Sequence, residues 1–175
     1  SWKSDPRDMA LLRDTWTEDF ETLYVLGSKM YMHIFNQCPT IKKLFPFIAK
    51  YEATGRDFTE DAEFRTQALR LVQIIAKVVE REANLDGLET FLYKLGYRHV
   101  QYLSDALKPQ YWEIFRVRLS TEDRERAILV DCIVICESNL SFQVWKDVVV
   151  YVVSHMKEGY NDALKGKNRF PTAMI

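Results

Sequence analysis

Glycine and proline are scarce in this chain, and their scarcity limits the folds that the chain can adopt. The sequence contains six glycines and five prolines in 175 residues. A strand-rich fold needs many tight turns, and turns depend heavily on these two residue types. The long stretches without them favour helices, so we expect an all-α protein.

Length and hydropathy are those of one globular domain. A chain of 175 residues buries roughly 70% of the surface exposed by its unfolded state, without help from a metal or a disulfide. The longest uninterrupted apolar run, Val148 to Val153, is far shorter than the ~20 residues that span a bilayer. We therefore expect a single domain over residues 1–175, with its folded core between about 5 and 165, and no membrane span.

The charge and the cysteine content limit the classes of binding partner and the cellular compartment that we expect. Lys and Arg number 24 against 25 Asp and Glu, which leaves no net field to attract nucleic acid. The three cysteines, Cys38, Cys132 and Cys136, form no CxxC pair, and no secretory signal opens the sequence. We expect a cytoplasmic protein that does not bind nucleic acid.

Apolar residues recur every three or four positions through most of the chain, which predicts amphipathic helices. Capping residues and breakers suggest where these helices begin and end. We expect helices from Ser4, from Thr17 to Pro39, from about Asp57 or Thr59, from Leu88, from Pro109, and from Ser141 to about Leu164, with an irregular corner over Thr40 to Asp57.

Three polar residues stand on these otherwise apolar stripes. They are Tyr31, Gln67 and His99, and burying such groups costs free energy unless they have partners. A single buried histidine is more often a core residue with a hydrogen bond than a metal ligand, and a buried tyrosine usually donates to a carbonyl. Taken one at a time, these positions do not indicate a function.

Their order along the chain, together with the motifs around them, resembles that of the globins. Residues 38–47, CPTIKKLFPF, match the family's second-helix exit, in which Phe45 is the phenylalanine that packs on the haem face. Residues 64–69, FRTQAL, are similar to the start of the distal helix, with Gln67 where histidine often stands. Residues 95–99, LGYRH, are similar to the proximal helix, with His99 as the iron ligand.

Other positions extend the resemblance over essentially the whole chain. Trp16 matches a first-helix tryptophan, and Gly27 matches the small residue where the second and distal helices cross, here against Ala68. Residues 156–160, MKEGY, are similar to nematode and other invertebrate globins. About ten extra residues between Phe115 and Phe142 imply an insertion near the sixth helix and the corner after it.

The resemblance implies a globin fold of about eight helices around haem b, iron protoporphyrin IX. His99 would hold the iron, and its second ring nitrogen would donate to the carbonyl of Leu95. Arg70 and Arg98 would either pair with the propionates or lie in solvent. The apolar walls would come from Phe45, Phe47, Leu71, Leu95, Tyr102 and Leu103.

The distal side implied by the resemblance favours oxygen binding. Tyr31 and Gln67 would donate hydrogen bonds to O₂, and CO and NO are further candidate ligands. The remaining histidines, His33 and His155, lie outside the distal helix, which excludes bis-histidine coordination through the usual position. We expect reversible O₂ binding for storage, transport or sensing.

Two alternatives remain open. One is a haem redox protein or enzyme that acts on nitric oxide, nitrite or peroxide, or that transfers electrons. The other, a domain that has lost its haem, is disfavoured because His99, Phe45 and the polar distal residues are all present.

Overall fold

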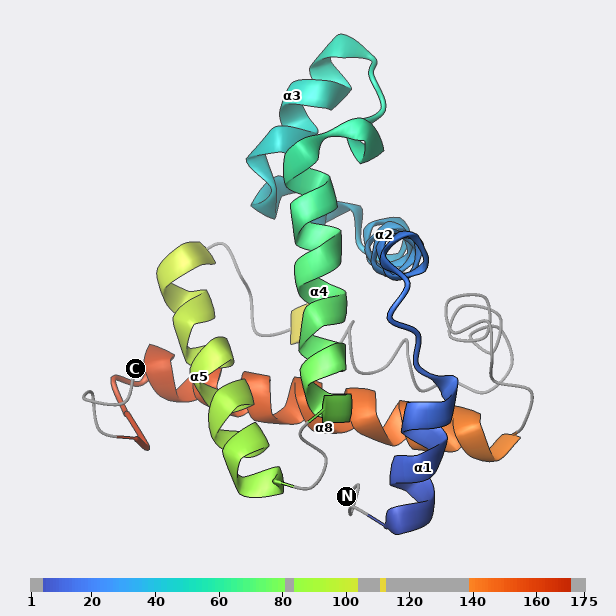
Figure 1. The fold of residues 1–175 in the computed structure, drawn as a ribbon. Helices are drawn as coiled ribbons and strands as arrows, with labels where there is room; N and C mark the ends of the chain where they lie inside the picture. Colours follow the sequence, from blue (N-terminus) through green and yellow to red (C-terminus); the bar gives the residue numbers. More distant parts are fainter. Residues whose placement is uncertain (1–4, 81–83, 104–110, 113–138, 171–175) are drawn as a thin grey trace.

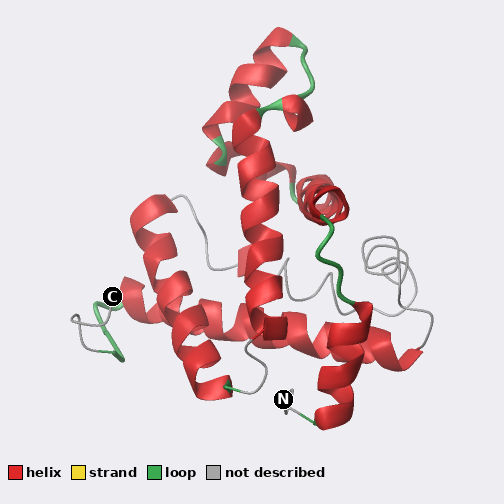
Figure 2. Ribbon diagram, viewed as in Figure 1, coloured by secondary structure: helices red, strands yellow, loops and turns green. Residues whose placement is uncertain are grey.

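The structure is a computed structural model that describes residues 5–80, 84–103, 111–112 and 139–170. Over these ranges the chain forms α-helices and two short 3₁₀ helices without a strand, which confirms the all-α prediction (Figures 1 and 2). The helices are α1 (Pro6–Thr15), α2 (Phe20–Gln37), η1 (Pro39–Leu44), α3 (Pro46–Thr54), η2 (Phe58–Glu60), α4 (Ala62–Glu80), α5 (Leu85–Leu103) and α8 (Asn139–Leu164).

Aspartates, rather than the hydroxyl residues expected from the sequence, cap the first two helices. The Asp5 side chain accepts a hydrogen bond from the backbone N–H of Arg7, and the Asp19 side chain accepts one from Thr22. Thr17 was predicted to cap α2, but its hydroxyl oxygen accepts from the backbone N–H of Asp19 instead. This bond places Asp19 one residue before the helix, where a carboxylate also favours the helix dipole.

The expected irregular corner contains a helix that periodicity does not reveal. Residues 46–54 form α3, which has Pro46 in its first turn and ends at Thr54, with Gly55 as its C-terminal cap. Gly55 has φ of 66°, a left-handed conformation that terminates helices and favours glycine. Because α3 buries only the adjacent Phe47 and Ile48, it carries no spaced apolar stripe.

The α4 and α2 helices cross in very close contact, as the sequence predicted. Gly27 of α2 lies against the main chain of Ala68 in α4, and a Cβ atom at this glycine would overlap the Ala68 carbonyl. The two backbones approach this closely because neither residue has a bulky side chain. This crossing places the start of α4, with Phe64 and Gln67, beside α2.

The α5 and α8 helices form a second close crossing, in which each helix contributes one glycine. Gly96 of α5 lies against the carbonyl of Met156, and Gly159 of α8 lies against the carbonyl of Tyr93. Both glycines are needed because a side chain at either would collide with the facing backbone. The crossing therefore sets the position of α5 one turn before His99.

The first and last helices are joined by a buried hydrogen bond. Trp145 of α8 donates from its indole Nε1 to the hydroxyl of Thr15 at 2.8 Å. The ring of Trp16 lies 5.7 Å from that of Trp145, centroid to centroid. Thr15, which directly precedes Trp16, thus accepts the hydrogen bond that the buried indole N–H of Trp145 needs.

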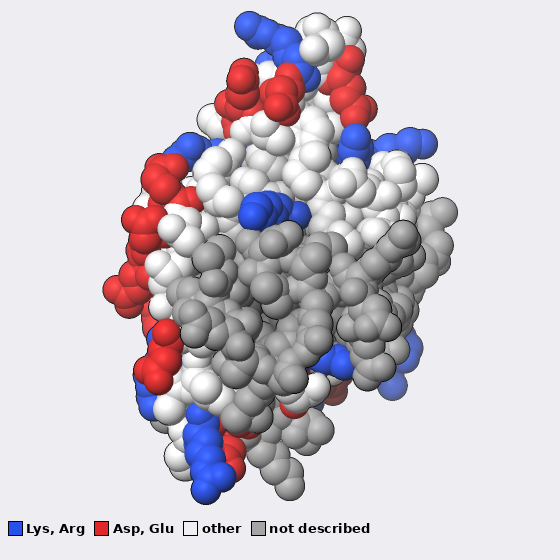
Figure 3. All heavy atoms as spheres, turned by 90° about the vertical axis from the view of Figure 1, so that its right-hand side faces the viewer, with Lys and Arg blue, Asp and Glu red and all other residues white. Residues whose placement is uncertain are grey.

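The surface shown in Figure 3 carries acidic and basic side chains interspersed, and its described residues form no broad basic patch. Within the described ranges, no helix is long and apolar enough to cross a membrane. The helix expected from Pro109, the insertion before Phe142, and Cys132 and Cys136 lie outside the described residues, except for Tyr111 and Trp112.

Candidate functional site

His99 lies near the end of α5 with one ring nitrogen already engaged. Its Nδ1 atom is 2.7 Å from the carbonyl oxygen of Leu95, one turn earlier, which confirms the predicted acceptor. A carbonyl only accepts hydrogen bonds, so Nδ1 carries the proton and the lone pair of Nε2 is available to a metal. Burial lowers the pKa of His99 below its usual value, and the hydrogen bond to Leu95 opposes that shift only in part. The imidazole is therefore neutral at physiological pH, as an iron ligand must be.

Trp112 is a neighbour of His99 that sequence reasoning missed. Its ring lies 5.7 Å from the imidazole of His99 and 5.7 Å from the ring of Tyr160. The side chain is only 6% exposed, and its indole Nε1 has no hydrogen-bond partner. Trp112 follows the predicted helix start at Pro109 by three residues, and nothing local to it in the sequence indicates contact with α5.

Tyr31 of α2 projects into a cluster of aromatic rings. The Tyr31 ring lies 5.7 Å from Phe35, 5.6 Å from Phe45 and 6.1 Å from Phe64. Burial raises the pKa of the Tyr31 phenol to about 12, although the positive charge of Arg70 acts to lower it. The phenol keeps its proton at neutral pH and is a hydrogen-bond donor.

Two residues of α4, Phe64 and Arg70, lie close to Tyr31. Phe64 touches the Tyr31 ring, and the charge of Arg70 is near enough to influence its pKa. Gln67 lies between them, three residues from each, and its side chain is half-buried. Neighbours on both sides of Gln67 thus approach Tyr31, while convergence of Tyr31 and Gln67 on one ligand stays a prediction.

The remaining residues of the predicted site fall into three groups. Phe45, Leu71 and Leu95 are half-buried and pack against the edge of the core, and Phe47 is buried against Phe45. Arg70 and Arg98 are exposed, as groups at the edge of a cofactor or in solvent would be. Tyr102 and Leu103 belong to α5, but their side chains lie outside the described residues.

The helices that carry the two halves of the site are supported separately. The α4 helix crosses α2 and the α5 helix crosses α8, whereas α4 and α5 make few close backbone contacts with each other (Figure 1). A neutral imidazole with a fixed second nitrogen, aromatic side chains and exposed arginines form a donor set that fits haem. His99 would hold the iron, and Phe45, Leu71 and Leu95 would contact the porphyrin.

Comparisons with known proteins identify the family and the fold of the chain. The sequence profile of the family described as Globin matches residues 28–122, more than half of the chain, and this range includes Tyr31, Phe45, Gln67 and His99. The fold is similar to a solved structure described as a hexacoordinated haem protein from an anhydrobiotic tardigrade at pH 4. The TM-score is 0.67 at 21% identity, over 90% of this chain and 95% of that chain. No curated protein matches the sequence. The chain belongs to the globin family, and this membership implies that it binds haem.

Proposed function

We propose that this globin binds O₂ reversibly, for storage, transport or sensing, with His99 as the proximal ligand and Tyr31 and Gln67 as distal donors. Haem supplies the iron atom at which a diatomic ligand binds. The observation that carries the proposal is the Tyr31 phenol, which is half-buried, packs against aromatic rings and has its pKa raised by desolvation to about 12. A protonated donor among apolar side chains favours a ligand that bears partial negative charge, as O₂ does when bound and CO does much less.

The proximal half of the proposal rests on the hydrogen bond between His99 and Leu95. Because Nδ1 donates to a carbonyl of the same helix, the ring orientation is set by α5 itself. Rotation of the imidazole would break that bond. The chain therefore presents Nε2 in one orientation and in the unprotonated form, both of which are needed to hold iron.

The distal half rests on the energy of hydrogen bonds in an apolar pocket. Each neutral hydrogen bond contributes about 1 kcal/mol, so two donors would slow loss of O₂ by about ten- to a hundredfold. Arg70 provides a positive charge near Tyr31, which adds to the favourable field for a partially negative ligand.

Absorption spectra of the purified ferrous protein test the proposal directly. Addition of O₂ should convert the deoxy spectrum to a distinct oxy spectrum. Removal of O₂ under vacuum should restore the deoxy spectrum, and the conversion should be repeatable over several cycles. Immediate and complete oxidation to the ferric form on first contact with O₂ would contradict reversible binding.

A redox role is the second candidate, and one observation favours it. The structurally similar tardigrade protein is described as hexacoordinated. A haem with both axial positions taken by protein suits electron transfer better than ligand storage. In this chain α4 contains no histidine, so Tyr31, Gln67 and Met32 are the candidates for a sixth ligand from the distal side.

A further inference from the structure

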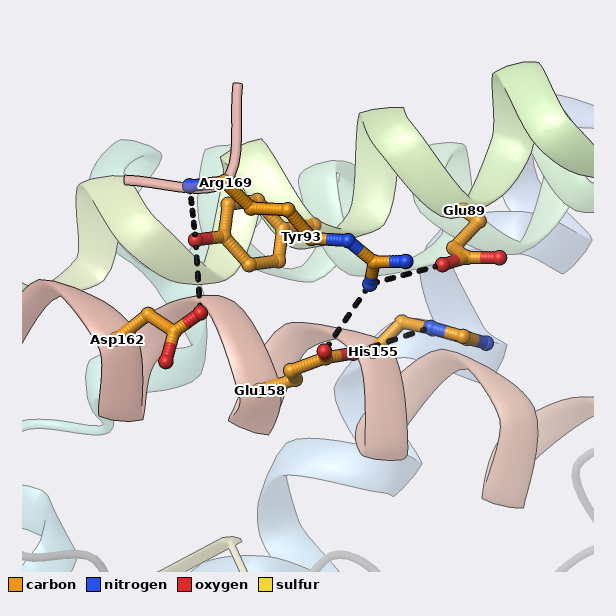
Figure 4. A network of polar contacts seen from close by, with 6 residues as sticks. All are labelled: Glu89, Tyr93, His155, Glu158, Asp162 and Arg169. Atoms are coloured by element: carbon orange, nitrogen blue, oxygen red, sulfur yellow. Dashed lines mark hydrogen bonds and ion pairs between the residues drawn. The ribbon is translucent and has the colours of Figure 1, made fainter. Parts of the chain in front are cut away.

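Three side chains capable of binding a metal converge where α5 and α8 cross, apart from the residues assigned to haem. Glu89 comes from α5, and His155 and Glu158 lie three residues apart on α8 (Figure 4). One ligand atom from each lies within 4.8 Å of the other two. The glycine crossing of Gly96 and Gly159 holds the two helices close enough for this convergence.

A cationic group already lies between the two carboxylates. The guanidinium of Arg169 contacts Glu89 at 3.1 Å and Glu158 at 3.0 Å through the same nitrogen. Two carboxylate oxygens thus point to one position of positive charge, which the arginine occupies. Figure 4 shows both contacts converging on this guanidinium.

His155 has a nitrogen that the arginine does not use. Its Nδ1 atom is buried and has no hydrogen-bond partner, and it lies 3.8 Å from an oxygen of Glu158. That separation exceeds the length of a hydrogen bond. A buried nitrogen without a partner costs free energy, and coordination to a cation would satisfy it. The arginine alone therefore accounts for the two carboxylates but leaves the imidazole unsatisfied.

We propose that Glu89, His155 and Glu158 bind a divalent transition-metal ion, with Zn²⁺ as the best match, in competition with Arg169. Imidazole and carboxylate are ligands that zinc prefers, and three protein ligands with one water complete a tetrahedral site. Tetrahedral bonds of the usual length place ligand atoms about 3.4 Å apart, whereas the present ligand atoms lie up to 4.8 Å apart, so the side chains must close by up to about 1.4 Å. The three side chains are 32%, 21% and 45% exposed, which leaves them room to move.

Competition with Arg169 follows from the charges. A zinc ion would take the position between the carboxylates, and two cations cannot share it without strong repulsion. Arg169 also donates from its backbone N–H to the hydroxyl of Tyr93 at 3.1 Å, and Phe170 packs on the Tyr93 ring at 5.1 Å. Metal binding would break the ion pairs of Arg169 with the two glutamates. The contacts of Arg169 and Phe170 with Tyr93 would remain.

The test measures binding of Zn²⁺ to the full-length, haem-loaded protein by isothermal titration calorimetry and by equilibrium dialysis with elemental analysis. One zinc ion should bind per chain. Both Glu158→Gln and His155→Gln should weaken that binding by about tenfold or more. Glu52→Gln, which removes an exposed carboxylate from the separate ion pair with Lys42, should leave it unchanged and is the matched control.

Arg169→Gln gives a second test that removes no ligand. Since it deletes the competing cation, it should strengthen zinc binding severalfold, and it remains informative if a ligand variant fails to fold. Retained haem absorbance and helical circular dichroism verify folding of each variant. Equal zinc affinity in wild type, Glu158→Gln and His155→Gln would overturn the site, and unchanged affinity in Arg169→Gln would overturn the competition.

Discussion

Gly96 of α5 lies against the main-chain carbonyl of Met156 in α8, so closely that the space holds a hydrogen atom but no side chain. His99 follows Gly96 by three residues on the same helix. The position of the candidate iron ligand is therefore determined by a backbone contact with α8 rather than by the side chains around it. A shift of α5 at this contact would displace the His99 imidazole together with its hydrogen-bond partner, the carbonyl of Leu95.

Substitution of Gly96 by alanine should destabilise the protein and weaken its hold on haem. The added Cβ collides with a main-chain atom that cannot rotate away, so α5 must shift, at a cost of about 1–3 kcal/mol. Urea unfolding and haem-transfer rates measure the two effects. Gly87→Ala is the control on the same helix, because its Cβ would approach a side chain, that of Asn84, instead of a main-chain carbonyl. Equal stability of the two variants would contradict the importance of the crossing.

Replacement of His99 by alanine should abolish tight haem binding. The variant loses the only histidine of α5, and Leu95 keeps a carbonyl without its donor. Haem titration followed by absorbance gives the stoichiometry and affinity, and added imidazole should restore part of the ferrous spectrum by filling the vacated space. Normal stoichiometry with an unchanged ferrous spectrum would end the assignment of His99.

The ferrous protein without added ligand should be five-coordinate and high-spin. The reason is that α4 carries Gln67 instead of histidine, and an amide is a weak ligand for iron. Resonance Raman spectra and the visible bands distinguish the two coordination states. A six-coordinate low-spin spectrum would mean that Tyr31, Gln67 or Met32 reaches the iron, and it would favour the redox alternative.

Removal of either distal donor should speed the loss of O₂ far more than the loss of CO. Tyr31→Phe keeps the ring and its packing on Phe45 and Phe64 while deleting only the hydroxyl, so about a tenfold increase in O₂ dissociation is expected. Gln67→Leu should act in the same direction. Stopped-flow measurements on both variants, with CO as the internal comparison, provide the rates. If the O₂ dissociation rates of both variants lie within about a factor of two of the wild-type rate, Tyr31 and Gln67 do not stabilise bound O₂ and their role is structural.

Features that depend on neighbours in the sequence were predictable. The scarcity of glycine and proline indicated helices. The spacing of apolar residues and the capping residues located the start of α4 to within five residues and both ends of α8 to within two. The hydrogen bond from His99 to Leu95 was expected from the resemblance to globins, and it can form because residues four apart on a helix are adjacent. The α3 helix was not predicted, because it is short and buries two consecutive residues, so its apolar residues show no helical periodicity.

Contacts between helices were decided by the tertiary structure. The crossing of Gly27 and Ala68 was anticipated through family resemblance, whereas the reciprocal crossing of Gly96 and Gly159 was not. The approach of Trp112 to His99 and the convergence of Glu89 with His155 have no local signature either. Periodicity shows which face of a helix is buried, but the partner of that face depends on the angle and register at which two helices cross. In this protein, backbone contacts at Gly96 and Gly159 determine both the angle and the register at the crossing of α5 and α8, where residues 60 or more positions apart meet.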